Sequence, residues 1–148
     1  MMIKNVAVAF CALALVSACS KKSMDSANDA LNARFIKEAG SDRVFFALDK
    51  HNVNEEGKTV LHKQAEWLKT NSSVKATVEG HCDERGTREY NLALGEKRAN
   101  AAAAVLKGHG VNCDRIEVIS YGKERPADMG HDQAAYKQNR RAVTVVRK

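Results

Sequence analysis

Two residues of opposite charge, Asp83 and Arg98, have types and a spacing suited to binding a charged ligand. On a helical wheel Arg98 shares one side with Asn91, Leu94 and Gly95, so it borders the face that is expected to be buried. A guanidinium keeps its charge on burial and therefore needs an anionic partner. Asp83, at the exit of the preceding strand, could reach the mouth of this helix. The pair could then hold a zwitterion, with Asp83 accepting an ammonium and Arg98 binding a carboxylate through two nitrogens.

The same pair could instead be a structural ion pair, because carboxylates and guanidiniums at loop mouths often neutralise each other and contribute little. The spacing alone leaves both interpretations open. Gly95 adds a separate observation, since glycine inside a helix costs about 1 kcal/mol relative to alanine. Its presence indicates that another backbone or a ligand passes close to this point of the helix.

Metal and nucleophile chemistry are disfavoured at the neighbouring residues His81, Cys82 and Asp83. Consecutive residues of a strand point to alternate sides, and neither C-x-x-C nor H-x-x-x-H accompanies them. The chain also lacks a G-x-S-x-G elbow. We therefore expect no metal, no cofactor and no catalytic residues, and the chain is not expected to be an enzyme.

The composition predicts one domain with a preceding tail, because 148 residues are too few for two ordinary domains. The formal net charge is +6, which favours an acidic partner: nucleic acid, anionic lipid or an anionic polymer. Export of the chain, which its N-terminus predicts, disfavours nucleic acid, and the scattered aromatic residues form no stacking platform.

The N-terminus has the features of a secretory signal, with Lys4 preceding an apolar run from Val6 to Ala18. This run is shorter than the roughly 20 residues that a membrane-spanning helix needs. Its end, VSAC, resembles the lipobox of bacterial lipoproteins, which predicts a signal peptide over residues 1–18 and lipid on Cys19. An ordinary signal peptide cleaved near Ala18 is the alternative. Cys19 is followed by Ser20 and not by an aspartate, a pattern that resembles the signal for sorting to the outer membrane. Residues 19–42 are expected to form a lipidated tether in which a short helix is possible.

The rest of the chain alternates strand and helix patterns and predicts an α+β domain over residues 43–148. The order is β-α-β-α-β-β, which gives a mixed four-stranded sheet with helices packed on one face. The segment between the last two strands is expected to be a loop with one helical turn at most. The expected strands cover 43–48, 74–79, 115–122 and 141–146, and the expected helices cover 54–71 and 91–107.

The stretch VEGHCDERGTREYNLALGEKRANAAAAVL, with FFALDK before it and NRRAVTVV after it, resembles the outer-membrane protein A-like C-terminal domain family. The family motif N-x-x-L-x-x-x-R-A is matched by Asn91, Leu94, Arg98 and Ala99. The resemblance implies that Asp83 and Arg98 bind the diaminopimelate of peptidoglycan stem peptides, whose side chain ends in an ammonium and a carboxylate. It also places near the ligand three residues that could equally shape loops or cap a helix: Asp49, Arg85 and Asn91.

Other positions are less clear from the resemblance. Cys82 departs from the small or hydroxyl residue usual in the family, and Arg140 and Arg141 are expected to have structural or surface roles. Cys82 and Cys113 are expected to remain free, because they would lie at opposite ends of two parallel strands.

The resemblance is strongest to lipid-anchored members of the family that face the periplasm. It implies a non-catalytic link between the outer membrane and peptidoglycan, a role in envelope integrity and cell division, and a partnership with the periplasmic propeller protein TolB. A peptidoglycan hydrolase and a wall-binding lipoprotein outside the TolB system are the alternatives.

Overall fold

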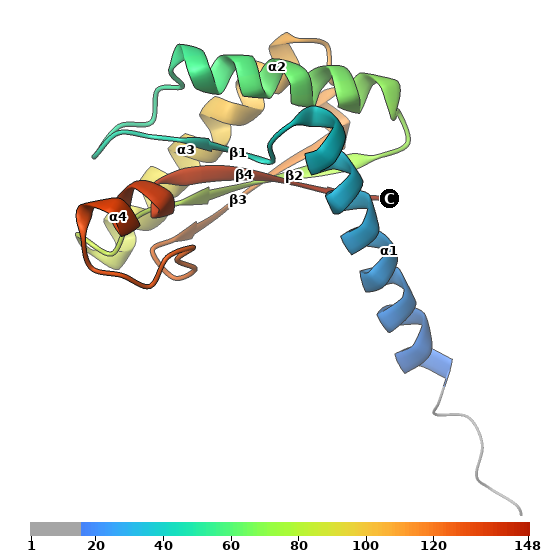
Figure 1. The fold of residues 1–148 in the computed structure, drawn as a ribbon, viewed down its shortest axis with the longest axis horizontal. Helices are drawn as coiled ribbons and strands as arrows, with labels where there is room; N and C mark the ends of the chain where they lie inside the picture. Colours follow the sequence, from blue (N-terminus) through green and yellow to red (C-terminus); the bar gives the residue numbers. More distant parts are fainter. Residues whose placement is uncertain (1–15) are drawn as a thin grey trace, which may run out of the picture.

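The structure is a computed structural model that describes residues 16–148, with side chains from residue 21 onward. Most of the predicted signal peptide lies outside the described residues. The elements in chain order, shown in Figure 1, are α1 (Val16–Ala39), β1 (Arg43–Phe45), α2 (Glu55–Thr70), β2 (Lys75–His81), α3 (Arg88–Gly108), a single 3-10 turn (Cys113–Arg115), β3 (Ile116–Gly122), α4 (Gln133–Asn139) and β4 (Arg141–Arg147). Within this part of the chain, no helix has both the length and the apolar character needed to cross a membrane.

The four strands form one mixed sheet in the order β1-β4-β2-β3. β2 and β3 are parallel, and β4 runs antiparallel to both of its neighbours, β1 and β2. Alternate residues of β2, Ala76 and Val78, enter one core with Leu61 and Leu68 of α2 and Leu106 of α3. The predicted α+β class and the mixed four-stranded sheet are confirmed.

Local signals explain where the two central helices begin. Asn54 caps α2, and its side chain accepts a hydrogen bond from the Gly57 backbone nitrogen at 2.8 Å. Thr87 caps α3 in the same way through the Tyr90 nitrogen. α3 therefore starts at Arg88, earlier than predicted, and Asn91 lies inside its first turn.

A contact between two glycines sets the crossing of α3 over β2. A Cβ atom added to Gly80 would lie 1.7 Å from the Gly95 carbonyl oxygen, and one added to Gly95 would lie 2.3 Å from the Ser120 hydroxyl. Only glycine at both positions allows the helix to come this close to the sheet. The predicted close approach at Gly95 is confirmed, and the partner is the backbone of Gly80.

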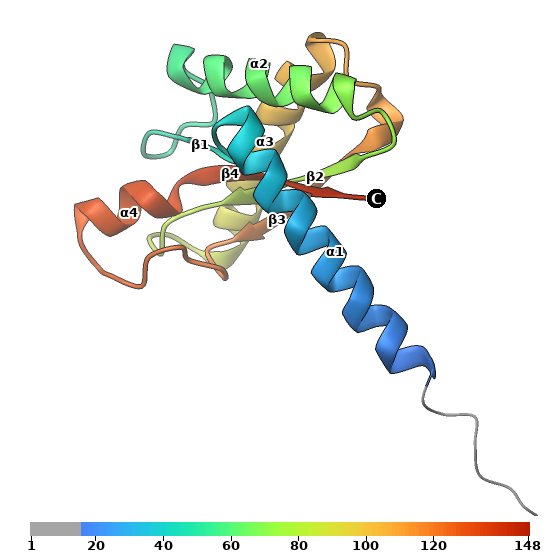
Figure 2. The ribbon, with the colours of Figure 1, turned by 45° about the vertical axis from the view of Figure 1, so that its right-hand side comes forward.

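α1 covers most of the segment that was predicted to be a tether. Its last turns pack onto the domain, where Phe35 and Ala39 are buried and the Phe35 ring contacts the Trp67 ring edge-on, with centroids 5.0 Å apart. Asn32 exchanges two hydrogen bonds of 2.8 Å with the Val146 backbone, at a part of β4 that β1 does not reach. The packed unit therefore begins before residue 43, while the N-terminal part of α1 projects away from the body of the molecule (Figure 2).

β1 is shorter than the predicted strand because the chain leaves the sheet after Phe45. The Phe46 nitrogen still donates to the Arg140 carbonyl, and a loop then runs to Asn54. Asp49 in this loop has a positive φ of 55°, a conformation that aspartate tolerates better than most residues. The predicted loop before β4 contains a seven-residue helix, α4, which Asp132 caps through the Ala135 nitrogen.

The two cysteines with described side chains, Cys82 and Cys113, are free, as predicted. Cys82 follows the carboxyl end of β2, whereas Cys113 precedes the amino end of the parallel strand β3.

Candidate functional site

A pocket of about 300 Å³ opens at the carboxyl end of β2. Three segments form most of it, the loop after β1, the loop after β2 and the first turns of α3, and Arg140, between α4 and β4, adds a fourth part. Every residue that the sequence singled out for ligand binding in the domain lies here. The lining residues are Leu48, Asp49, Cys82, Asp83, Arg85, Gly86, Tyr90, Asn91, Leu94, Arg98 and Arg140.

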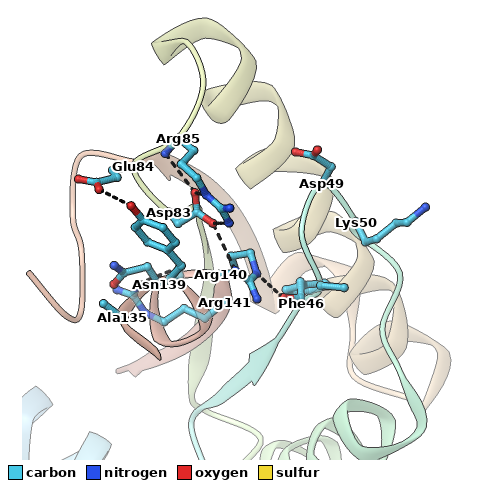
Figure 3. Close-up of polar contacts among 12 residues, drawn as sticks. Phe46, Asp49, Lys50, Asp83, Glu84, Arg85, Ala135, Asn139, Arg140 and Arg141 are labelled. Carbon is cyan, nitrogen blue, oxygen red and sulfur yellow. Dashed lines mark hydrogen bonds and ion pairs between the residues drawn. The ribbon is translucent and has the colours of Figure 1, made fainter. Parts of the chain in front are cut away.

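Asp83 is held by two arginines. Arg85 binds it in a bidentate manner, with Nε 3.1 Å from Oδ1 and Nη2 2.7 Å from Oδ2, and the Arg85 backbone nitrogen also donates to Oδ1 at 3.1 Å. Arg140 lies farther away, with Nη1 3.4 Å from Oδ2. Figure 3 shows both arginines meeting this carboxylate. The negative charge of Asp83 is therefore already compensated within the protein.

Arg98 is fully buried and makes a different set of contacts. It donates from Nε to the Lys50 carbonyl at 2.8 Å, from Nη1 to the His81 carbonyl at 2.9 Å and from Nη2 to the Ala47 carbonyl at 3.1 Å. Among residues 21–148 it forms no salt bridge with any carboxylate. The ion pair between Asp83 and Arg98, which the sequence left open, is absent from this structure.

The charges of the site follow from these contacts. Burial alone would raise the pKa of Asp83, but hydrogen bonds from Arg85 and Arg140 outweigh it and hold the pKa below its usual value. Burial lowers the pKa of Arg98, yet a guanidinium stays charged at neutral pH. Each terminal nitrogen of Arg98 donates to one backbone carbonyl and carries a second N–H. The pocket therefore presents a positive charge that can take an anionic group.

Asp49 supplies a second carboxylate on the opposite side of the site. It accepts a hydrogen bond from the Tyr90 hydroxyl at 3.2 Å, and burial together with this contact raises the pKa of Tyr90. Figure 3 shows Asp49 and Lys50 on one loop, and Asp83, Glu84 and Arg85 on another. Because Arg98 donates to the carbonyls of Ala47 and Lys50, it also anchors the loop that carries Asp49.

Asn91 and Leu94 form the helical wall of the pocket. Asn91 is buried and donates from Nδ2 to the Arg85 carbonyl at 2.9 Å and to the Thr87 carbonyl at 3.0 Å, so it shapes the loop after β2. Leu94 contributes an apolar surface. The Cys82 thiol donates to the Asn91 carbonyl at 3.3 Å, and burial raises the pKa of this thiol.

The structure thus brings together Asp49, Asp83, Arg85, Asn91, Leu94 and Arg98. Cys19 lies in α1, far from the pocket in sequence, and its side chain is outside the described residues. The sequence interpretation missed Tyr90 and assigned Arg140 no place at the site. Arg141 keeps a structural role, since its terminal nitrogens donate to the carbonyls of Asn139 and Arg125.

Other chemistries find little support in the described part of the chain. It contains no group of three histidine, cysteine, aspartate or glutamate side chains placed to hold a metal ion. His81 is buried with both ring nitrogens lacking a hydrogen bond, and it stacks on Tyr121 with ring centroids 5.6 Å apart. The pocket is lined by charged side chains of both signs and lies on a small α+β domain.

Comparisons with known proteins define the family. The chain belongs to the OmpA family, whose model matches residues 45–141. It is 43% identical to a peptidoglycan-associated lipoprotein of Mesorhizobium japonicum, over 95% of this chain and 90% of the relative. It is 40% identical to a peptidoglycan-associated lipoprotein of Haemophilus influenzae, over 88% of this chain and 90% of that one.

Solved structures agree with this assignment. The crystal structure of the peptidoglycan-associated lipoprotein from Burkholderia pseudomallei matches with a TM-score of 0.72 and 38% identity, over 76% of this chain and 99% of the other. The C-terminal domain of Helicobacter pylori MotB matches with a TM-score of 0.68 at 20% identity, over 72% of this chain and 84% of that one, which shows a shared fold. The family and the relatives support the prediction that the chain is a binding protein and not an enzyme.

Proposed function

We propose that this chain is an outer-membrane lipoprotein whose domain binds peptidoglycan noncovalently through diaminopimelate. The observation that carries the proposal is a pocket that combines a buried, unpaired guanidinium, Arg98, with the carboxylates of Asp49 and Asp83. The names of its relatives, peptidoglycan-associated lipoproteins, support the same ligand class.

The free end of a diaminopimelate side chain carries one ammonium and one carboxylate, which fits this distribution of charge. The carboxylate would bind the remaining N–H groups of Arg98 in a charge-assisted manner. The ammonium would bind one of the two carboxylates, Asp83 or Asp49. Leu94 would contact the methylene groups, and Asn91 would keep the loop of Arg85 in place.

The anchor and the cellular role rest on the sequence. Lipid on Cys19 would hold the protein in the outer membrane, with the domain facing the periplasm and the projecting part of α1 as a spacer. Several acyl chains would make this attachment effectively permanent, at about 0.8 kcal/mol per buried methylene group. The role would be to link the outer membrane to the wall, for envelope integrity and cell division in a Tol-Pal system with TolB as partner.

A pull-down with purified sacculi tests the ligand. The fragment from Ser23 onward keeps the packed turns of α1 and should sediment with sacculi. Free diaminopimelate should compete, whereas 1,5-diaminopentane, which has the same two ammonium groups but no carboxylate, should compete poorly. Equal competition by both would contradict recognition of the carboxylate. Release of soluble muropeptides from the same sacculi would instead support a hydrolase, and sacculus binding without association with TolB would place the protein outside a Tol-Pal system.

A further inference from the structure

A contact between α4 and the loop after β2 lies next to the pocket without lining it. The Tyr136 hydroxyl donates to Glu84 Oε1 at 2.7 Å. The guanidinium carbon of Arg85 lies over the same ring, 4.4 Å from its centroid. Glu84 and Arg85 directly follow Asp83, so one aromatic side chain contacts both of its successors.

The loop is also held from other directions. His131 Nδ1 lies 2.9 and 2.8 Å from the two carboxylate oxygens of Glu84. Lys123 Nζ donates to the Gly86 carbonyl at 2.7 Å and to the Glu84 carbonyl at 3.3 Å. Lys123 thus holds the loop backbone and His131 holds the Glu84 side chain, whereas Tyr136 also contacts the Arg85 side chain.

Although α4 is short, hydrogen bonds at its end hold it, and with it Tyr136, in place. Asn139 at its end accepts hydrogen bonds from the backbone nitrogens of Ala127 at 2.7 Å and Asp128 at 2.9 Å, and it donates to the Asp128 carbonyl at 2.8 Å. The Tyr136 ring is therefore presented at a defined position relative to the preceding loop.

We propose that Tyr136 is a positioning residue for ligand recognition, acting through Arg85. The inference rests on the proposed function and adds a residue from outside the pocket. The Arg85 side chain is 35% exposed and would sample several rotamers without support. Between the Asp83 carboxylate and the Tyr136 ring it has one favoured position, in which it orients the carboxylate toward the pocket. A ligand then binds a site whose side chains are already ordered, so less free energy is lost in ordering them on binding.

Two substitutions separate the ring from the hydroxyl. Tyr136→Leu removes both contacts, and we expect diaminopimelate binding to weaken by about three- to tenfold. Tyr136→Phe keeps the ring under the guanidinium and should stay within about twofold of the wild type, since His131 still holds Glu84. Lys137→Ala, an exposed substitution on the same helix, is the matched control and should bind as the wild type does.

A double-mutant cycle tests whether the effect passes through Arg85. In an Arg85→Ala background, Tyr136→Leu should cause no further loss, because the residue on which it acts is gone. Binding is measured by calorimetry with a diaminopimelate-containing stem peptide and the full chain in detergent, and thermal unfolding is recorded for each variant. If Tyr136→Leu does not fold, Tyr136→Met, which also removes the ring and the hydroxyl but keeps a long side chain, replaces it in the cycle, with a loss of the same sign that Arg85→Ala again removes.

The outcomes are distinct. If the wild type does not bind the peptide, the proposed function fails and this inference fails with it. If the wild type binds and Tyr136→Leu binds equally well, or loses the same factor with and without Arg85, only the positioning role is overturned. The positioning role is supported if Tyr136→Phe binds nearly as the wild type does and the loss in Tyr136→Leu disappears in the Arg85→Ala background.

Discussion

Arg98→Ala is the substitution that best separates recognition from stability. The side chain is buried and donates to three backbone carbonyls, those of Ala47, Lys50 and His81. Its removal therefore frees the loop after β1 as well as deleting a charge from the pocket. Arg115 is a matched control at the other end of the sheet, where it donates to the carbonyls of three other residues: Leu68, Asn71 and Val74.

The expected loss of stability follows from these contacts. A hydrogen bond from a charged donor contributes about 1.5–3 kcal/mol, and a carbonyl left without water or a partner bears a similar cost. Arg98 borders an open pocket, so water can reach some of the carbonyls after truncation. We therefore expect Arg98→Ala to lower the free energy of unfolding by about 3–5 kcal/mol. Arg115 is less buried, and its loss should be about 2–3 kcal/mol. A domain in the upper part of the typical range of about 5–15 kcal/mol would stay folded with either change.

Urea unfolding followed by the fluorescence of Trp67, the single tryptophan, gives the stabilities. Diaminopimelate binding is then measured without denaturant, where both variants are folded. We expect Arg115→Ala to bind normally and Arg98→Ala to lose at least tenfold in affinity, corresponding to about 1.4 kcal/mol or more. Normal binding by folded Arg98→Ala would refute its role as a ligand group. A stability loss below about 1 kcal/mol would refute the anchoring of the loop.

Two further predictions concern Asp83 and the cysteines. The lowered pKa of Asp83 means that its ionised form contributes stability above the unfolded value of about 3.9, and that this contribution disappears as the pH falls through the folded pKa. Unfolding free energies from pH 7 to 2 should thus fall less steeply below pH 4 for Asp83→Asn than for the wild type, and parallel curves would contradict the assignment. Iodoacetamide should alkylate exposed Cys113 at least about tenfold faster than Cys82, whose thiol is buried with a raised pKa, and diaminopimelate should slow Cys82 further. Equal rates at the two thiols, read by peptide mass spectrometry, would contradict the burial of Cys82.

Periodic elements were the most predictable part of the fold. The spacing of Val60, Leu61, Ala65 and Leu68 predicts α2, because each of these positions returns to the same side of the helix. Gly95 predicts a close approach because glycine has no other advantage there. α1 was harder to interpret, since this long polar segment contributes only a few apolar residues to the core: Leu31, Phe35 and Ala39. α4 has seven residues, too few for a clear period.

The sequence predicted which residues form the site better than it predicted which groups they contact. Motif spacing brings Asp83 and Arg98 to one region, but the partner of each depends on segments far away in sequence. Arg140 reaches Asp83 only because β4 lies between β1 and β2 in the sheet. Arg98 reaches the carbonyls of residues 47 and 50 only because β1 ends early. Neither arrangement has a local sequence signal.

The two ends of a zwitterionic ligand meet unequal conditions in this pocket. Asp83 already accepts four hydrogen bonds from two arginines, so an incoming ammonium must weaken an existing contact or turn to Asp49. Within the described part of the chain Arg98 has no carboxylate partner, and an incoming carboxylate would supply one without displacing any of its bonds to carbonyls. A buried charge that gains its missing partner contributes more than an exchange between two partners. Under the proposed function, the carboxylate of diaminopimelate should therefore provide more of the affinity than the ammonium.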